Sequence, residues 1–219
     1  RTGETISYGQ LEDRSHQGAQ LFRKLGLKTG DAVAIFMENN ARFLDICWAA
    51  QRAGLYYTCI SSRLTAGEVE YIVKDCGAKA FIASHSLAKV AGEVAPLIPG
   101  VKLLMVGGTI PGYAGYEDSA AAMPAERIAD ETSGTDMLYS SGTTGRPKGV
   151  RLALSGLPID APSPLTMLAS MLFGITKDSV YLSPAPLYHA APLLECMAMH
   201  RLGGTVVVMD HFDPEGALQ

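Results

Sequence analysis

The sequence has little of what marks several specialised classes of protein. No apolar run reaches the ~20 residues that a membrane-spanning helix needs, and no signal-peptide pattern is visible near Arg1. The 219 residues carry a formal net charge of −4 without a basic block, which disfavours a nucleic-acid surface. There is no internal repeat or low-complexity tract. With 47% hydrophobic residues, the chain is long enough for a sizeable core in one or two domains.

Cysteine is also scarce, and its placement does not fit the usual roles of clustered thiols. The four cysteines lie far apart, with no CxxC pair and no cluster with histidine. Each stands among apolar or small residues, so we expect reduced structural thiols in a cytoplasmic protein, not a disulfide framework or a metal site. These residues are Cys47, Cys59, Cys76 and Cys196.

Apolar runs that predict strands alternate with stretches that predict helices along most of the chain. Ser7 with Gln10, and Thr65 with Glu68, have capping-box spacing, and residues 39–40 precede another helical stretch as a cap. This alternation predicts an α/β fold with a mostly parallel sheet covered by helices on both faces. The expected strands are residues 6–8, 32–37, 55–60, 79–83, 101–106, 135–140, 149–153, 179–182 and a buried strand over 205–209; further helices are expected over 87–97, 116–122, 165–173 and 188–201.

The stretch Tyr139–Val150 combines glycine, hydroxyl residues and one lysine after a predicted strand. Glycine allows a tight bend and a close approach to the backbone, and successive N–H groups in such a bend form a concave anion site. Hydroxyl groups add donors for phosphate oxygens, Lys148 adds a positive charge and Pro147 stiffens the exit. The candidate phosphate-binding residues are therefore Ser140, Ser141, Gly142, Thr143, Thr144, Gly145 and Lys148.

Two other interpretations of this stretch fit less well. A Walker loop needs a second glycine where Pro147 stands, and a hydroxyl residue after the lysine, where the chain has Gly149. A flexible Ser/Gly linker rarely ends in a Pro-Lys-Gly exit followed by an apolar run. We therefore expect a phosphate loop that differs from that of P-loop NTPases.

The twelve residues 139–150 resemble the phosphate loop of the adenylate-forming superfamily, which contains acyl-CoA synthetases, adenylation domains of peptide synthetases and luciferases. Weaker segments that also resemble this superfamily occur, in the order expected for it, between Thr5 and about Pro214. The resemblance implies that residues 1–219 are part of an N-terminal AMP-binding domain, without the C-terminal domain. Both ends look like cuts through a longer protein, and Asp213-Pro214 predicts the start of a helix. Residues 151–156 lack the Thr-His pair of many relatives, which leaves the packing of the loop exit open.

The resemblance implies a two-step reaction for the full-length parent. A carboxylate attacks the α-phosphate of Mg-ATP to give acyl-adenylate and pyrophosphate, and a thiol, usually that of CoA, then takes the acyl group. The resemblance assigns residues 140–145 and Lys148 to ATP, with Thr144 as a candidate contact to Mg²⁺ through ATP. The family's adenine, ribose and catalytic-lysine segments have no counterpart here, so we expect the 219 residues alone to be inactive.

A second segment, residues 184–192, resembles the aromatic-histidine segment that lines the acyl pocket of acyl-CoA synthetases. The resemblance assigns Tyr188 and His189 to this pocket; the alternative is a histidine that is hydrogen-bonded at a helix start. Peptide-synthetase relatives carry an aspartate there, so an amino-acid substrate is disfavoured, whereas fatty and aryl acids are not distinguished. The other histidines are expected to be surface or capping residues: His16, His85, His200 and His211.

Three further points stay open from the sequence. The acyl group could be passed to a carrier protein instead of CoA, or the chain could be a nucleotide- or acyl-binding module without catalysis. A second copy of this chain could also bind to the surface that truncation of the longer protein would expose. The expected partners are small molecules, namely a carboxylic acid, ATP and CoA, and not nucleic acid.

Overall fold

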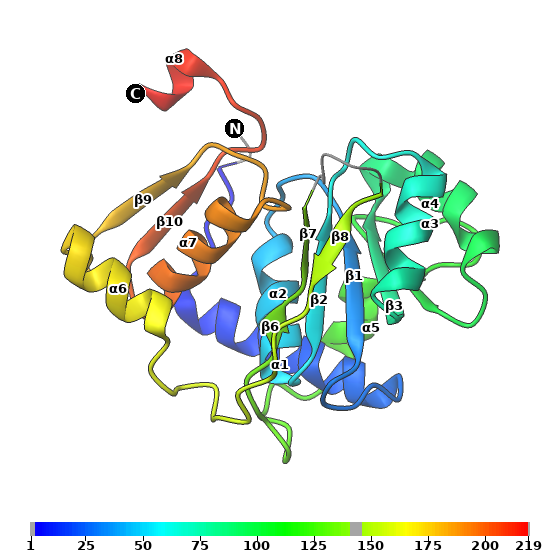
Figure 1. Ribbon diagram of the computed structural model, residues 1–219, viewed down its shortest axis with the longest axis horizontal. Helices are drawn as coiled ribbons and strands as arrows, with labels where there is room; N and C mark the ends of the chain where they lie inside the picture. The colour runs from blue at the N-terminus through cyan, green and yellow to red at the C-terminus, as the bar shows by residue number, and fades with distance from the viewer. Residues whose placement is uncertain (1–2, 141–145, 219) are drawn as a thin grey trace.

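Six parallel strands form the main sheet of the computed structural model, which describes residues 3–140 and 146–218 (Figure 1). Their order across the sheet is β5-β4-β3-β1-β2-β6. The strands are β1 (Ala32–Phe36), β2 (Tyr56–Ile60), β3 (Ala78–Ser84), β4 (Lys102–Val106), β5 (Ala114–Gly115) and β6 (Thr135–Asp136). This arrangement confirms the expected α/β fold with a mostly parallel sheet.

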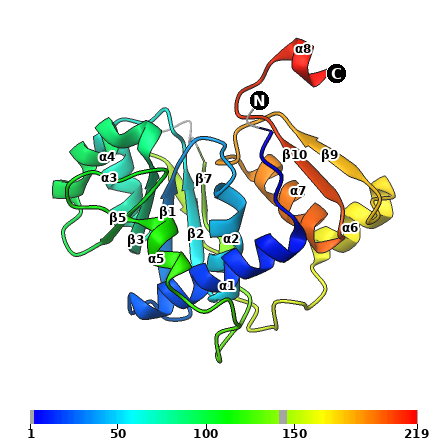
Figure 2. The same cartoon turned by 180° about the vertical axis from the view of Figure 1, so that it is seen from behind.

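Helices cover both faces of this sheet, because alternate residues of a strand point to opposite sides. From β1, Val33 and Ile35 pack in the core with α1, α2 and α5, whereas Ala34 and Phe36 pack with α3 and α4. Figure 2 looks onto the side that carries α1 and α5. The helices are α1 (Tyr8–Lys24), α2 (Phe43–Arg52), α3 (Ala66–Asp75), α4 (Ala88–Val94), flanked by the 3-10 turns His85–Leu87 and Ala95–Leu97, and α5 (Tyr116–Ala121).

The helices α1 and α3 begin with the two capping boxes that the sequence predicts. At α1, the Ser7 hydroxyl accepts from the backbone N–H of Gln10, and the Gln10 side chain accepts from the backbone N–H of Ser7. Thr65 and Glu68 form the same reciprocal pair at α3. The prediction of a strand over residues 6–8 is wrong, because these residues lead into the α1 cap.

The predicted cap of α2 is also wrong. This helix begins at Phe43, and Arg42 occupies the N-cap position without a side-chain hydrogen bond. Asn40 forms only a local turn, in which its side chain donates to the Glu38 carbonyl and accepts from the Arg42 N–H. The Asn39 side chain, which is buried, bonds to a later part of the chain.

The strand predicted over residues 135–140 is divided between two sheets. Its first part is β6, at the edge of the main sheet next to β2. Its second part, β7 (Leu138–Ser140), pairs antiparallel with β8 (Lys148–Val150), which is shorter than the predicted strand over 149–153. The chain therefore leaves the main sheet after β6, just before the glycine-rich stretch. The strands on either side of that stretch, β7 and β8, form an antiparallel hairpin of their own.

A smaller unit follows the loop over residues 151–163 and contains α6 (Pro164–Phe173), the parallel strands β9 (Val180–Ser183) and β10 (Thr205–Val208), α7 (Ala190–Arg201) and α8 (Pro214–Ala217). Side chains from α7, including Leu193 and Cys196, belong to the main core. The strand predicted over 205–209 is present as β10, but the prediction that it is buried is wrong. One face of the strand pair stays exposed, with 68% exposure at Val180 and 45% at Val207. As predicted, α8 begins at an Asp-Pro pair, with Asp213 as its N-cap.

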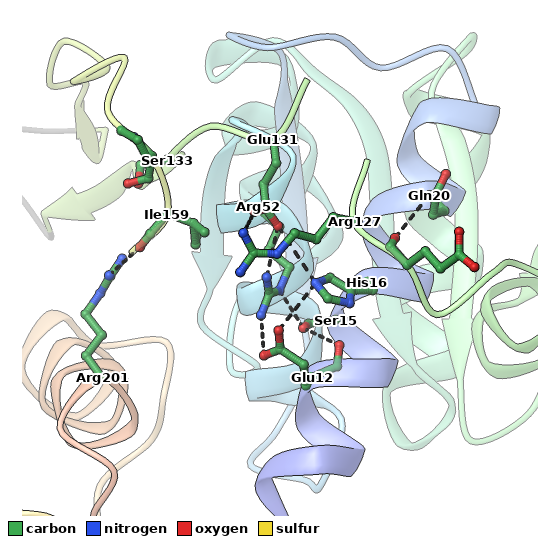
Figure 3. A network of polar contacts seen from close by, with 12 residues as sticks. Glu12, Ser15, His16, Gln20, Arg52, Arg127, Glu131, Ser133, Ile159 and Arg201 are labelled. Atoms are coloured by element: carbon green, nitrogen blue, oxygen red, sulfur yellow. Dashed lines mark hydrogen bonds and ion pairs between the residues drawn. The ribbon is translucent and has the colours of Figure 1, made fainter. Parts of the chain in front are cut away.

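A polar network ties the connection over residues 122–134 to α1 and α2 (Figure 3). The buried Arg52 side chain donates to Glu131 Oε1 at 2.9 Å and pairs with Glu12. His16 lies within this network and is buried, so its predicted surface position is wrong. Burial, together with the positive charge of Arg52, lowers the pKa of His16. The network anchors the segment that leads into β6.

His200 is the second histidine that the sequence misplaces. It is half-buried on α7, where its Nδ1 accepts a hydrogen bond from Trp48 Nε1 at 3.0 Å. Because Trp48 belongs to α2, this bond joins the smaller unit to the helices of the main sheet. Burial lowers the pKa of His200 to about 4. His85 and His211 are exposed, as expected.

Two features that are sparse in the sequence can be described in the structure. The four cysteines are all free and buried, in agreement with structural thiols. Among the described residues, none of the helices has the length and apolar character that crossing a membrane requires.

Candidate phosphate and acyl site

The hairpin β7–β8 places the two ends of the candidate phosphate loop side by side. Ser140 is paired with Lys148, and Tyr139 with Gly149, across the two strands. Both Ser140 and Lys148 are exposed, and Lys148 forms no ion pair with any residue in the described part of the chain. The hairpin therefore presents a hydroxyl group and a positive charge at one place. The other candidates, Ser141, Gly142, Thr143, Thr144 and Gly145, lie outside the described residues.

Gly149 is needed where it stands because the ring of Tyr139 lies directly over it. A Cβ atom at Gly149 would come within 2.8 Å of Tyr139 Cζ and within 2.8 Å of Met137 Cε. The ring of Tyr139 can thus pass across β8 and reach the neighbouring helix. The packing of the Tyr139 ring therefore explains why glycine follows Lys148 at the loop exit, independently of any ligand.

Helix α3 contacts both ends of the loop, which the sequence did not reveal. The Tyr139 hydroxyl donates to Asp75 Oδ2 at 2.5 Å, and the Tyr71 hydroxyl donates to the Pro147 carbonyl at 3.2 Å. The guanidinium carbon of Arg146 lies 5.1 Å from the centre of the Tyr71 ring, within the range of a cation–π contact. An open cavity of about 970 Å³ lies beside these contacts, lined by α3, Arg146 and Pro147.

The loop exit packs on the main sheet through Arg151 and Leu152. Both residues belong to the segment 151–156, which lacks the Thr-His pair. The Arg151 guanidinium lies 4.2 Å from the centre of the Tyr56 ring and donates to the Gly30 carbonyl at 3.0 Å. The Tyr56 hydroxyl donates to the Leu152 carbonyl at 2.7 Å. These contacts fasten the loop exit to β2 and to Gly30, which lies just before β1.

Tyr188 and His189 lie at the start of α7, where His189 is the N-cap residue. The alternative interpretation from the sequence is a histidine that is hydrogen-bonded at the start of a helix. His189 does lie at a helix start, but it is exposed and makes no side-chain cap hydrogen bond. The two rings lie side by side, with 4.6 Å between their centroids. Neither residue lines the cavity beside α3.

Asn39 fixes this second segment to the end of β1. Its Oδ1 accepts from the Leu187 N–H at 2.8 Å, and its Nδ2 donates to the carbonyls of Ala185 and Met209 at 3.1 and 2.8 Å. In Figure 1 the ends of β1 and β7 and the segment before α7 lie at the same edge of the molecule. Ligands of open α/β sheets bind outside the carboxyl ends of the strands. The two candidate segments are therefore placed at the edge where a ligand is expected.

Comparison with known proteins identifies the family of this chain. A model of the AMP-binding enzyme family matches residues 1–218. A feruloyl-CoA synthase from Amycolatopsis sp is 32% identical over 219 residues, and long-chain-fatty-acid–CoA ligase FadD13 from Mycobacterium tuberculosis is 29% identical over 219 residues. These alignments cover 99% and 97% of this chain and 41% of each relative. The chain thus spans about two fifths of their length.

A similar fold is found among solved structures. The crystal structure of ATP-bound MatB from Rhodopseudomonas palustris aligns with 99% of this chain and 42% of that one, with a TM-score of 0.80 and 27% sequence identity. The sequence match extends over nearly the whole chain, and the structural match does the same. The chain belongs to the AMP-binding enzyme family, as an N-terminal portion similar to that of acyl-CoA ligases.

Proposed function

We propose that residues 139–150 bind the β- and γ-phosphates of Mg-ATP, in the N-terminal portion of an enzyme that joins a carboxylic acid to CoA. The observation that carries this proposal is the hairpin β7–β8, which presents Ser140 beside Lys148. Lys148 is exposed and, among the described residues, has no carboxylate partner, so its charge is available to an anion. The solved ATP-bound relative supports ATP as the nucleotide.

The role of the loop in this reaction is electrostatic. When a carboxylate oxygen attacks the α-phosphorus of ATP, the bond to the bridging oxygen breaks and pyrophosphate leaves with additional negative charge. Lys148 and the hydroxyl of Ser140 would stabilise that charge, together with the residues 141–145 assigned by resemblance. Thr144 is the proposed contact to Mg²⁺ through the nucleotide. None of these residues would form a covalent bond to substrate.

We further propose that Tyr188 and His189 line the pocket for the acyl group. Their adjacent rings offer an apolar face with polar edges, and Leu187 beside them is buried and hydrogen-bonded to Asn39. The names of the two relatives mention a feruloyl group and a long-chain fatty acid, which supports an aryl or fatty acid as the substrate class and CoA as the acceptor.

Residues 1–219 are proposed to bind nucleotide without completing the reaction. The chain spans 41% of the length of each of these two relatives, and the proposal is that turnover needs parts of such an enzyme that lie outside these 219 residues. A pyrophosphate-release assay with Mg-ATP, CoA and a panel of fatty and aryl acids tests this. No turnover above the rate without protein is expected, and robust turnover would show that the chain is catalytically complete.

Phosphate binding itself is tested by phosphorus NMR of Mg-ATP and of AMP titrated with the protein. Because the loop is assigned to the β- and γ-phosphates, their resonances should shift or broaden before that of the α-phosphate. AMP, which lacks both groups, should bind at least about 10-fold more weakly, given the strength of charge-assisted hydrogen bonds to phosphate. Equal affinities for AMP and Mg-ATP would refute the assignment of the loop.

A further inference from the structure

One face of helix α3 presents two polar side chains to the hairpin. Tyr71 and Asp75 are four residues apart, and residues at this spacing lie on the same side of a helix. The opposite side of α3 is apolar and buried through Val69, Ile72 and Val73, which fixes the rotation of the helix about its axis. Tyr71 and Asp75 are therefore held by the core in the direction of β7 and β8.

Each of these side chains contacts a different end of the phosphate loop. Asp75 accepts a hydrogen bond from Tyr139, the residue immediately before Ser140. Tyr71 donates to the carbonyl of Pro147, the residue immediately before Lys148, and also contacts Arg146 through its ring. Ser140 and Lys148, the two residues assigned to phosphate at the loop ends, therefore each directly follow a residue that forms a hydrogen bond with α3.

A second constraint makes the contact between Tyr139 and Asp75 specific. Gly149 leaves space for the Tyr139 ring, and Met137, whose carbonyl accepts from the Thr58 hydroxyl at 2.9 Å, holds the base of the hairpin against β2. With its base fixed to the sheet and its ends fixed to α3, the hairpin has a defined direction. Such fixing lowers the ordering entropy that ligand binding must otherwise overcome.

We propose that Tyr71 and Asp75 are positioning residues for the phosphates of ATP: from helix α3 they hold the two ends of the loop, so that Ser140 and Lys148 stand in place before the nucleotide arrives. This inference rests on the proposed function of the loop. It assigns to α3 a role in nucleotide affinity that needs no contact between α3 and the nucleotide.

The main test compares the variants Asp75→Ala and Asp75→Asn by Mg-ATP titration. Asp75→Ala loses the acceptor for Tyr139 and should raise the dissociation constant of Mg-ATP about 3- to 10-fold, the range expected for one hydrogen bond. Asp75→Asn keeps an acceptor oxygen and should stay within about twofold of the wild type. Removing a negative charge near a polyanion would by itself strengthen binding. Weaker binding by Asp75→Ala therefore reports lost positioning.

The matched control is Glu70→Ala, which removes a negative charge from the same helix beside the same cavity. Glu70 pairs with Lys74 and has no described contact with the hairpin. This variant should bind Mg-ATP as tightly as the wild type or slightly more tightly. In a Tyr139→Phe background, Asp75→Ala should cause no further loss, because the hydrogen bond is already absent. A further loss as large as in the wild type would contradict the proposed contact.

Hydrogen exchange without nucleotide separates this inference from the proposed function. In Asp75→Ala and in Tyr71→Phe, the backbone amides of Arg146 and of residues 148–150 should exchange faster, with no change in exchange of the β1 amides. If the wild type binds no Mg-ATP, the proposed function fails and the positioning role fails with it. If the wild type binds Mg-ATP and Asp75→Ala binds it equally well or more tightly, the positioning role alone is overturned.

Discussion

The Oδ1 atom of Asn39 accepts a hydrogen bond of 2.8 Å from the backbone N–H of Leu187, across 148 residues of sequence. Two further bonds from Asn39 Nδ2 make this buried side chain the junction between β1 and the smaller unit. Replacing it by alanine leaves a buried N–H without a partner. We expect Asn39→Ala to lower the free energy of unfolding by about 2–4 kcal/mol, measured by urea denaturation.

Two variants sharpen this prediction. Asn39→Asp keeps the acceptor but places a negative charge beside two carbonyl oxygens, so it should be at least as destabilising as alanine at neutral pH. Asn40→Ala removes only two local hydrogen bonds, to Glu38 and Arg42, and should lower the free energy of unfolding by about 1 kcal/mol. Equal losses from Asn39→Ala and Asn40→Ala would contradict the junction role.

The burial of His200 predicts a loss of stability in mild acid. Its pKa is about 4 in the folded protein, against the ordinary value of 6.5. The unfolded chain therefore takes up a proton as the pH falls below 6.5, while the folded protein does so only near pH 4. Stability is retained above about pH 6.5 and falls progressively towards pH 4, by roughly 3 kcal/mol in total from this group.

The variant His200→Asn isolates that effect, since its side-chain oxygen can still accept from Trp48. Between about pH 7.5 and pH 5, the free energy of unfolding of the wild type should fall by about 2 kcal/mol more than that of the variant. His211→Asn, at an exposed position, is the matched substitution for comparison. If His200→Asn and the wild type show the same slope over this range, His200 is not buried in its neutral form.

Glycine substitutions test the packing that leads into β6. At Gly134 a Cβ atom would meet the Leu55 carbonyl oxygen and come within 2.9 Å of the Ala50 carbonyl, both of them backbone atoms. Gly134→Ala should lower the free energy of unfolding by about 2–3 kcal/mol, because backbone must shift.

Gly67, in the first turn of α3, provides the matched control. Open space surrounds it, and alanine favours helix, so Gly67→Ala should leave stability unchanged or raise it by up to about 1 kcal/mol. Thermal denaturation of both variants gives the comparison. A tolerated Gly134→Ala substitution would mean that the approach of residue 134 to β2 is looser than described.

Local signals predicted much of the fold because the forces behind them are local. The capping boxes at Ser7 and Thr65 depend on residues three positions apart, and the buried runs of β1 and β2 depend on their own side chains. Asn39 looked like a cap by the same local rule, yet its bonds go to residues some 150 positions away. The sequence alone does not show whether an asparagine will form a local helix cap or a long-range hydrogen bond.

The errors in burial have the same origin. His16 is buried and His200 is half-buried because Arg52 and Trp48 approach from another helix, and Val207 is exposed because its side of β10 is left uncovered. In the candidate site, the composition of the loop was readable, but the contact of Asp75 with Tyr139 was not. The one available clue was the placement of Tyr71 and Asp75 on the polar side of α3, opposite its buried face.

The most direct test of phosphate binding by the hairpin is the affinity of Mg-ATP for Lys148→Ala compared with Lys102→Ala. Both variants remove one exposed lysine, but Lys102 is the first residue of β4, at the opposite, amino edge of the sheet. In the phosphorus NMR titration, Lys148→Ala should raise the dissociation constant about 10-fold or more, and Lys102→Ala should leave it within about twofold. Equal dissociation constants for the wild type and Lys148→Ala would contradict the account.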